Sequence, residues 1–384
     1  MSESAGIGEF LAQTVASVED VVQTRLRRLR RRLGDSTKPT IVPYTGYANV
    51  SRAWFHGRVL TNPPRDVPDE DDGWWKNLAA MYRRLESDEV PGAAVEIDFG
   101  GTTHTVVTDA EGYFHLEAAA IDGVANDGLW TSAAMRLADR RHTSLVTARL
   151  MTPDPSTPLA IISDVDDTVL HTDAANLLSM ARHTFFHNAR TRKPLAGAAA
   201  WYRALQGGPD GRRNPIFYVS SSPWNLHDLI EDFLDLNDIP HGPVLLRDIG
   251  VQTVVDVAKE LAGGRAGGHD HKLEKALRVM AAFPNTRFVL IGDSGQEDAR
   301  LYAEAASQRG QQIAAIFIRD VDPALASHHD DAVGAAAQRC AAAGVPMHLV
   351  ADSLSAARIC ADAGLIPAAT LPAIQRDTRR DEER

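Results

Sequence analysis

The sequence of 384 residues lacks several features that would assign it to a class at once. It has no run of about 18 uninterrupted apolar residues, so we expect no membrane-spanning helix. Its first residues, MSESAGIGEF, do not place a basic segment before an apolar core, so we expect no signal peptide. Only two cysteines occur, Cys340 and Cys360, which excludes a disulfide framework and fits a reducing cytosol. These absences together favour a cytoplasmic location.

A net positive charge is lacking as well. The formal net charge is −11, which argues against nucleic acid as a partner. Positive charge is instead concentrated in six arginines between Arg25 and Arg32, while apolar residues recur in steps of three and four from Leu11 to Leu33. This pattern predicts a basic amphipathic helix within residues 1–35. The helix either packs on its own protein or makes peripheral contact, through residues 11–33, with the inner face of a membrane.

Residues 36–150 are predicted to be mostly β. The segment FHGRVL (55–60) has the pattern of a short strand. The longer segment AAVEIDFGGTTHTVVTDAEGYFHLEA (93–118) contains three alternating runs separated by a Gly-Gly turn and an Asp-Ala-Glu-Gly turn. The Pro- and Thr-rich residues 151–158 are predicted to be a linker.

From residue 159 the pattern changes to short apolar runs that alternate with helical stretches. The runs are LAIIS (159–163), NPIFYVS (214–220), GPVLL (242–246), RFVLIG (287–292), IAAIFI (313–318) and VPMHLVA (345–351). Continuous apolar strands that alternate with helices predict an α/β fold, in which a parallel sheet carries helices on both faces. We expect this domain to span residues 159–370, and the charged tail 371–384 to be disordered.

Polar groups lie at the ends of three of these predicted strands and at the start of one predicted helix. Asp164, Asp166 and Asp167 lie directly after the first strand, three serines (220–222) follow the second, and Lys272 begins a helix. The segment GDSGQED, which contains Asp293 and Asp298, follows the strand RFVLIG. Because ligands bind outside the carboxyl ends of parallel strands, we expect these clusters to form one site.

The chemistry of these groups suits a cation and a phosphoryl group. Asp164, Asp166 and Asp293 are hard oxygen ligands of the kind that Mg²⁺ prefers, and a cation would offset their mutual repulsion. A carboxylate beside Mg²⁺ can also act as a nucleophile and form an aspartyl phosphate. Lys272 and a serine hydroxyl would hold the oxygens of the transferred phosphoryl group.

The same segments resemble a known family. SDVDDTVLHT, FYVSSSPWNL, HKLEKALRVM and RFVLIGDSGQEDARLYAEAA are similar to the catalytic domain of the App1-type phosphatidate phosphatases, in the haloacid dehalogenase superfamily. The resemblance implies a Rossmann-like parallel sheet and a Mg²⁺-dependent phosphatase that acts through an aspartyl phosphate. More weakly, VVTDAEGYFHLEA resembles small transthyretin-like β-sandwiches, so we expect a β-sandwich-like domain before the α/β domain.

The resemblance also implies roles for individual residues. Asp164 would be the nucleophile and Asp166 the general acid and base, and both would contact the metal ion. Ser220, or Ser221 if the register differs by one residue, would supply the hydroxyl, and Lys272 would stabilise the phosphate. The implied metal ligands are Asp164, Asp166, Asp293 and Asp298.

The segment between His171 and Arg213 is too short for a large cap domain. Its aromatic residues include Trp201 and Tyr202, which we assign to core packing. An open site suits a large or membrane-borne substrate better than a small metabolite. The resemblance implies a phosphorylated lipid as the substrate, with phosphatidate cleaved to diacylglycerol and phosphate.

Two alternatives remain open from the sequence. One is a phosphatase for a soluble or polymeric phosphomonoester. The other is a catalytically idle scaffold, with the β-rich domain as its binding module.

Overall fold

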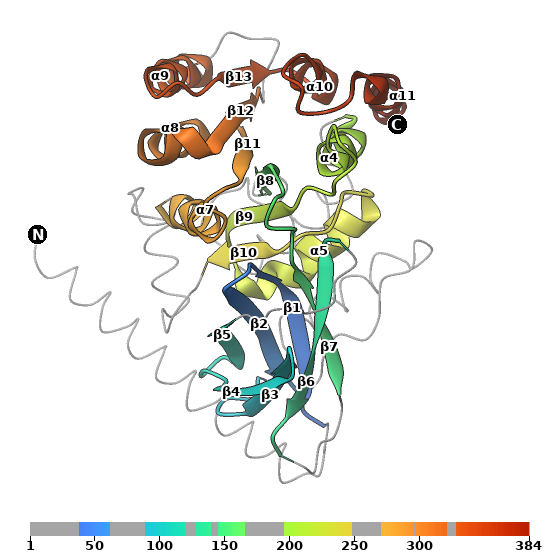
Figure 1. Cartoon of the computed structure of the whole chain (residues 1–384), viewed down its shortest axis with the longest axis vertical. Helices are drawn as coiled ribbons and strands as arrows, with labels where there is room; N and C mark the ends of the chain where they lie inside the picture. The colour runs from blue at the N-terminus through green and yellow to red at the C-terminus, as the bar shows by residue number, and fades with distance from the viewer. Residues whose placement is uncertain are drawn as a thin grey trace, which may run out of the picture.

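The computed structural model describes residues 38–61, 89–119, 128–139, 145–165, 196–247, 270–294, 297–320 and 328–383. The predicted helix in residues 1–35 and the candidate residue Asp166 lie outside these ranges. The described chain has a β part, made of the first seven strands, and an α/β part that begins at residue 159 (Figure 1).

The β part is one seven-stranded sheet in the order β4-β3-β6-β7-β1-β2-β5. Its strands are β1 (Thr40–Ala48), β2 (Arg52–Leu60), β3 (Ala94–Phe99), β4 (Thr102–Val107), β5 (Tyr113–Ala119), β6 (Trp130–Leu137) and β7 (Val146–Met151). One half of the sheet is β4-β3-β6-β7 and the other is β1-β2-β5. Side chains from both halves, such as Ile97 and Phe55, share one core, so the sheet curves around it. The predicted β-sandwich is not confirmed, because a short parallel pairing of Gly46 with Leu150 and of Tyr47 with Met151 joins the two halves.

The α/β part contains a six-stranded sheet in which every pairing is parallel. Its strands are β8 (Leu159–Asp164), β9 (Ile216–Pro223), β10 (Val244–Arg247), β11 (Arg287–Asp293), β12 (Ile313–Arg319) and β13 (Met347–Val350). Each coincides with one of the six apolar runs in the sequence, which confirms the predicted parallel sheet.

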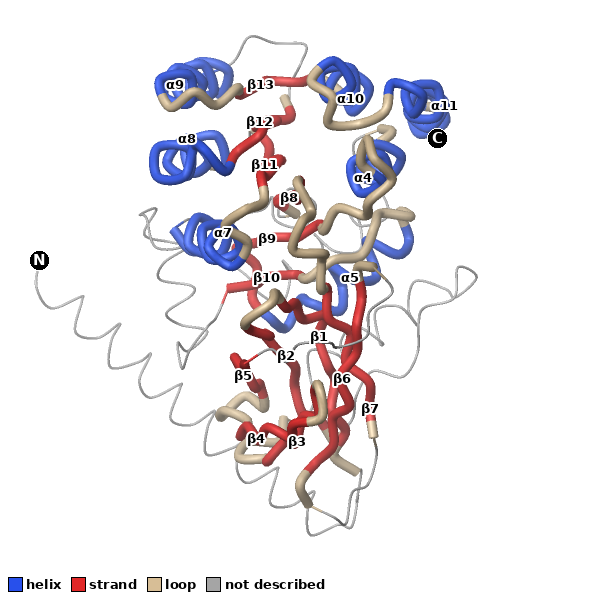
Figure 2. The backbone as a smooth tube through the Cα atoms, in the orientation of Figure 1, coloured by secondary structure: helices blue, strands red, loops and turns tan. Residues whose placement is uncertain are grey.

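Helices cover both faces of this sheet, as Figure 2 shows. One face carries α4 (Ala198–Gly207), α5 (His227–Leu236), α10 (Ser353–Asp362) and α11 (Leu371–Glu382). The other carries α7 (Asp270–Ala282), α8 (Asp298–Arg309) and α9 (His328–Ala342). Trp201 of α4 is 1% exposed and packs edge-on against Phe317 of β12, so its predicted role in the core is confirmed.

The strand order β10-β9-β8-β11-β12-β13 has a point of reversal. From β8 the chain proceeds outward through β9 to β10, and it then returns to the other side of β8 to form β11, β12 and β13. A crevice forms outside the carboxyl ends of the strands where the order reverses, and this is where open parallel sheets bind ligands. Here that point lies between β8 and β11.

The two parts pack against each other through aromatic side chains. Tyr47 of β1 is 1% exposed and meets Phe217 of β9 edge-on, with 5.5 Å between the ring centroids. Tyr44 stacks on Trp224, the residue directly after β9. The side chain of Asn49 donates a hydrogen bond of 2.7 Å to the carbonyl oxygen of Ala282, at the end of α7. The β part thus rests on β9, which pairs with β8, and on α7, which precedes β11 in the chain.

The prediction of a disordered tail at 371–384 is wrong for the described residues, because α11 occupies Leu371–Glu382. Its charged sequence conceals a buried face, on which Ile374, Asp377 and Thr378 lie against the rest of the α/β part. Charged residues dominate the remaining face, which produced the mistaken prediction. None of the described helices, α11 included, is long and apolar enough to cross a membrane.

The burial of α11 leads to a prediction about stability. Ile374 is fully buried, so Ile374→Ala should lower the free energy of unfolding by about 2–5 kcal/mol through lost transfer energy and a new cavity. Arg376→Ala, on the exposed side of the same helix, is the matched control and should change it by less than about 0.5 kcal/mol. Urea denaturation measures both, and equal stability of the two variants would show that α11 does not pack as described.

Candidate active site at the ends of β8 and β11

Asp164 is the last residue of β8 and lies at the reversal point. The strand is positioned by its neighbours on both sides, because Ile161 pairs with Ile216 of β9 and also with Val289 of β11. The side chain of Asp164 is only 3% exposed although its residue ends the strand. A carboxylate this well enclosed requires a positive partner.

Lys272 of α7 supplies that partner. Its Nζ atom lies 2.8 Å from Oδ1 of Asp164 and 3.2 Å from Oδ1 of Asp298, and its side chain is 2% exposed. One lysine therefore joins the end of β8 to the start of α8. Its two carboxylate partners offset the cost of burying the ammonium group this deeply.

Asp298 begins α8 and turns back toward the end of β11. Its Oδ2 atom accepts a hydrogen bond of 3.2 Å from the backbone N–H of Asp293. Gly292 makes this approach possible, because a Cβ atom at that position would lie 2.6 Å from Oδ2 of Asp298. Gly292, the first glycine of the GDSGQED segment, thus makes room for the carboxylate of Asp298.

Asp164, Asp293 and Asp298 each offer a carboxylate oxygen, and these atoms lie within 4.8 Å of one another. The three carboxylates carry three negative charges and Lys272 carries one positive charge, so this group of four side chains has a net charge of −2. A single divalent cation would balance that charge, and carboxylate oxygens are its preferred ligands. The donor set therefore fits Mg²⁺.

Two tyrosines border the cluster from other elements, Tyr302 buried and Tyr202 half-buried. The hydroxyl of Tyr302, on α8, donates to the carbonyl oxygen of Ile291 at 3.0 Å, and burial first, then the nearby Asp298, raises its pKa well above the usual value. The hydroxyl of Tyr202, on α4, lies 2.7 Å from Oγ of Ser163, and burial raises its pKa to about 12. Both hydroxyls therefore stay protonated and act as hydrogen-bond donors near neutral pH.

The serines at the end of β9 lie on the same edge of the sheet, since Val219 pairs with Asp164. Ser220 is 2% exposed, and its Oγ accepts a hydrogen bond of 2.9 Å from the backbone N–H of Ser222. Side chains alternate along a strand, and Val219 packs on the face that carries α7, as does Ile162 two residues before Asp164. The register of β9 with β10 shifts between Val219 and Pro223, so this alternation does not choose between Ser220 and Ser221.

The structure thus brings together four of the six predicted site residues, namely Asp164, Lys272, Asp293 and Asp298. Sequence reasoning missed Ser163 and the role of Tyr202, which it assigned to packing alone. Ser163 is a polar residue inside an otherwise apolar strand, directly before Asp164. This polar residue in an apolar strand could have marked Ser163 as a candidate. Its partner, Tyr202, becomes apparent only in the folded structure.

Comparisons with known proteins converge on this region. A family model described as "Phosphatidate phosphatase APP1, catalytic domain" matches residues 159–320. The protein "Phosphatidate phosphatase APP1" of Saccharomyces cerevisiae is 30% identical over 178 residues, which cover 46% of this chain and 28% of the yeast protein. An uncharacterized protein of Schizosaccharomyces pombe is 25% identical over 222 residues, which cover 56% of this chain and 34% of that protein.

These matches span about a third or less of the fungal proteins' length. Among solved structures, a carbohydrate acetylesterase from Xanthomonas citri is 10% identical, with a TM-score of 0.26 over 80% of this chain and 74% of that one. A likeness that weak carries no argument about fold or function. The sequence matches to the catalytic domain confirm the predicted resemblance.

The carboxylate cluster predicts cation binding that can be measured without turnover. Mg²⁺ at ten times its dissociation constant should stabilise the wild-type protein by about 1.4 kcal/mol, because it binds the folded state alone. Asp293→Ala should abolish this stabilisation, whereas Asp331→Asn, an exposed carboxylate on α9, should retain it. Thermal melts with Mg²⁺ and with EDTA measure the shift, and an equal shift in Asp293→Ala would place the cation elsewhere.

Proposed function

We propose that this protein is a phosphatase, since residues 159–320 carry an App1-type catalytic domain whose charged side chains converge on one point. The observation that carries the proposal is the contact of Lys272 with both Asp164 and Asp298 at the reversal point of the sheet. A lysine among carboxylates at such a crevice suits a phosphoryl group, whose oxygens need positive charge close by. The family match and the name of the yeast relative support the same activity.

The proposed cofactor is Mg²⁺, held by Asp164, Asp293 and Asp298 together with the predicted ligand Asp166. When bound, it would neutralise charge on the phosphoryl oxygens and orient them toward the nucleophile. The proposal is supported by the net charge of −2 on the four clustered side chains.

The proposed nucleophile is Asp164. Its carboxylate oxygen would attack phosphorus, and the bond between phosphorus and the ester oxygen would break as the new bond forms. Asp166 would give a proton to the departing alcohol and then take one from the water that hydrolyses the aspartyl phosphate. Lys272 would lie beside the phosphoryl oxygens throughout, and a hydroxyl from Ser220 or Ser221 would donate to one of them. In this scheme the carboxylate of Asp164 must keep one orientation toward phosphorus. Its burial at the end of β8 and its contact with Lys272 support such an orientation.

For the substrate we propose phosphatidate, cleaved to diacylglycerol and phosphate, in line with the printed name of the yeast relative. A soluble or polymeric phosphomonoester is the alternative within the same chemistry. We propose that the protein acts in the cytoplasm. With phosphatidate as its substrate, it would also have to contact a membrane surface. The predicted basic helix at residues 11–33 is our candidate for that contact. A haloacid-dehalogenase-like topology is likewise proposed, supported by the strand order around β8.

The proposal predicts Mg²⁺-dependent release of phosphate from phosphatidate in mixed micelles, faster than from soluble sugar phosphates. Asp164→Asn should abolish turnover and keep the fold, because an amide is nearly isosteric with a carboxylate but is a poor nucleophile. Asp331→Asn controls for the loss of a charge elsewhere in the domain. A colorimetric phosphate assay reports each rate, and circular dichroism reports the fold.

Three results of this assay would contradict parts of the proposal. Turnover by Asp164→Asn would remove the aspartyl-phosphate mechanism, and preference for soluble substrates would favour the alternative. No turnover of any phosphomonoester would favour the idle scaffold.

The basic N-terminal segment gives a separate prediction. Each arginine near an anionic bilayer contributes about 1 kcal/mol, and salt screens this attraction. Deletion of residues 1–34 should therefore weaken co-sedimentation with anionic liposomes at low salt and slow hydrolysis of lipid. Hydrolysis of a soluble phosphomonoester should stay unchanged. A thermal melt is the control, since unfolding on deletion would show that the segment packs on its own protein instead.

A further inference from the structure

Helix α4 begins without a local cap. Its N-cap residue, Gly197, has no side chain and a φ of 76°, and its first residues are three alanines. The first N–H groups of any helix have no partner within the helix, and they attract negative charge. The partners for α4 must therefore come from elsewhere in the chain.

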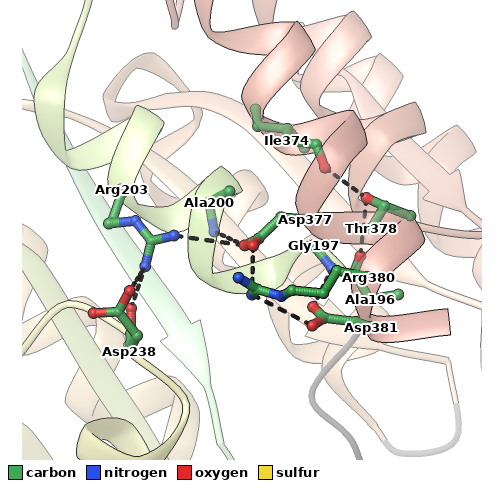
Figure 3. Close-up of polar contacts among 10 residues, drawn as sticks. All are labelled: Ala196, Gly197, Ala200, Arg203, Asp238, Ile374, Asp377, Thr378, Arg380 and Asp381. Carbon is green, nitrogen blue, oxygen red and sulfur yellow. Dashed lines mark hydrogen bonds and ion pairs between the residues drawn. The ribbon is translucent and has the colours of Figure 1, made fainter. Parts of the chain in front are cut away.

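They come from α11, which lies about 180 residues later in the sequence (Figure 3). The carboxylate of Asp381 accepts a hydrogen bond of 3.0 Å from the N–H of Gly197, and that of Asp377 accepts one of 3.2 Å from the N–H of Ala200. A Cβ atom at Gly197 would lie 2.2 Å from Oγ1 of Thr378, so the glycine also permits this close approach. Two acidic side chains of one helix thus cap the N-terminus of another.

The cap is held by arginines on both helices. Arg380 of α11 lies 2.5 Å from Asp377 and 3.5 Å from Asp381, and Arg203 of α4 lies 3.5 Å from Asp377. Arg203 also donates to the carbonyl oxygen of Asp238 at 2.7 Å, beyond the end of α5. These contacts fix the axial position of α4 relative to α11 as well as its capped end.

One turn into α4, Tyr202 connects the helix to the proposed nucleophile. Oγ of Ser163 donates to the backbone carbonyl of Asp164 at 3.0 Å and lies 2.7 Å from the hydroxyl of Tyr202. Since the single proton of Ser163 is used toward Asp164, the tyrosine hydroxyl must be the donor to Ser163. The position of α4 therefore determines where this pair holds the peptide of Asp164.

We propose that α11 is a clamp for the nucleophile: Asp377 and Asp381 seat α4, so that Tyr202 and Ser163 fix the backbone of Asp164. This inference rests on the proposed role of Asp164 and adds Tyr202 and Asp381 as positioning residues. Both would act through the position of the Asp164 backbone rather than on the substrate. Asp164 is then held from both faces of the sheet: Lys272 contacts its carboxylate from the α7 face, and Tyr202 acts on its peptide through Ser163 from the α4 face.

The first test separates kcat from KM. Tyr202→Phe removes only the hydroxyl and should lower kcat by about threefold to tenfold, the worth of one hydrogen bond, with KM unchanged. Asp381→Ala should lower kcat in the same way, and Asp381→Asn should restore it because the amide oxygen still accepts from Gly197. Glu382→Ala, which removes a neighbouring exposed carboxylate from α11, is the matched control and should leave kcat unchanged.

The decisive measurement is the double variant Asp381→Ala/Tyr202→Phe. If α11 acts through Tyr202, its kcat should match that of Tyr202→Phe alone, because the two changes interrupt one connection. Losses that multiply, or a change in KM in place of kcat, would overturn the proposal. Thermal melts identify any variant whose loss comes from unfolding at the assay temperature.

Hydrogen exchange tests the clamp without turnover. Asp381→Ala should speed amide exchange in the first turn of α4 and at the end of β8, while Asp381→Asn and Glu382→Ala should not. Unchanged exchange in Asp381→Ala would overturn the clamp even if kcat fell. A wild-type protein that hydrolyses no phosphomonoester would overturn the proposed function alone, because the exchange result decides the clamp by itself.

Discussion

The interaction on which the rest of the structure depends is the pair of buried contacts between Lys272 and the carboxylates of Asp164 and Asp298. Burying like charges is costly, and the cost is tolerable only where positive charge and hydrogen bonds are placed accurately. The parallel sheet provides this accuracy by ending β8 and β11 side by side. Helix α7 then carries the ammonium group across the strand ends, and Gly292 leaves room for Asp298. This arrangement supports the proposal that the site binds a divalent cation and a phosphoryl group.

The site also depends on parts of the chain beyond the segment that matches the catalytic-domain family, which ends at residue 320. Helix α11 packs on α4 and caps it, and the β part rests on the end of β9 and on α7 through Tyr44, Tyr47 and Asn49. The strand ends are thus supported from the β part and from the carboxy-terminal helix. Support of this kind would matter for the proposed nucleophile, Asp164, since small displacements of a reacting atom lower the rate.

The sequence predicted the α/β part well because strands buried on both faces are continuous apolar runs, a strongly local signal. It predicted the convergence of Asp164, Lys272, Asp293 and Asp298 because parallel topology places strand ends at one edge. It could not predict α11, because the partners of its buried acidic residues lie on or beside α4, 177 and 184 residues away in the sequence. It also missed the joining of the β part into one sheet, which rests on two residue pairs. The chemical roles of the site residues, Asp166 included, and the choice between Ser220 and Ser221 stay predictions.

The central claim, that Asp164 carries the phosphoryl group during turnover, can be tested by trapping that intermediate. The protein is mixed with phosphatidate and Mg²⁺, quenched in acid during turnover, reduced with borohydride and analysed by peptide mass spectrometry. Reduction converts an aspartyl phosphate to homoserine, so the account predicts homoserine at position 164, dependent on substrate and on Mg²⁺. Unmodified Asp164 in samples that were releasing phosphate, or homoserine at another aspartate, would contradict it.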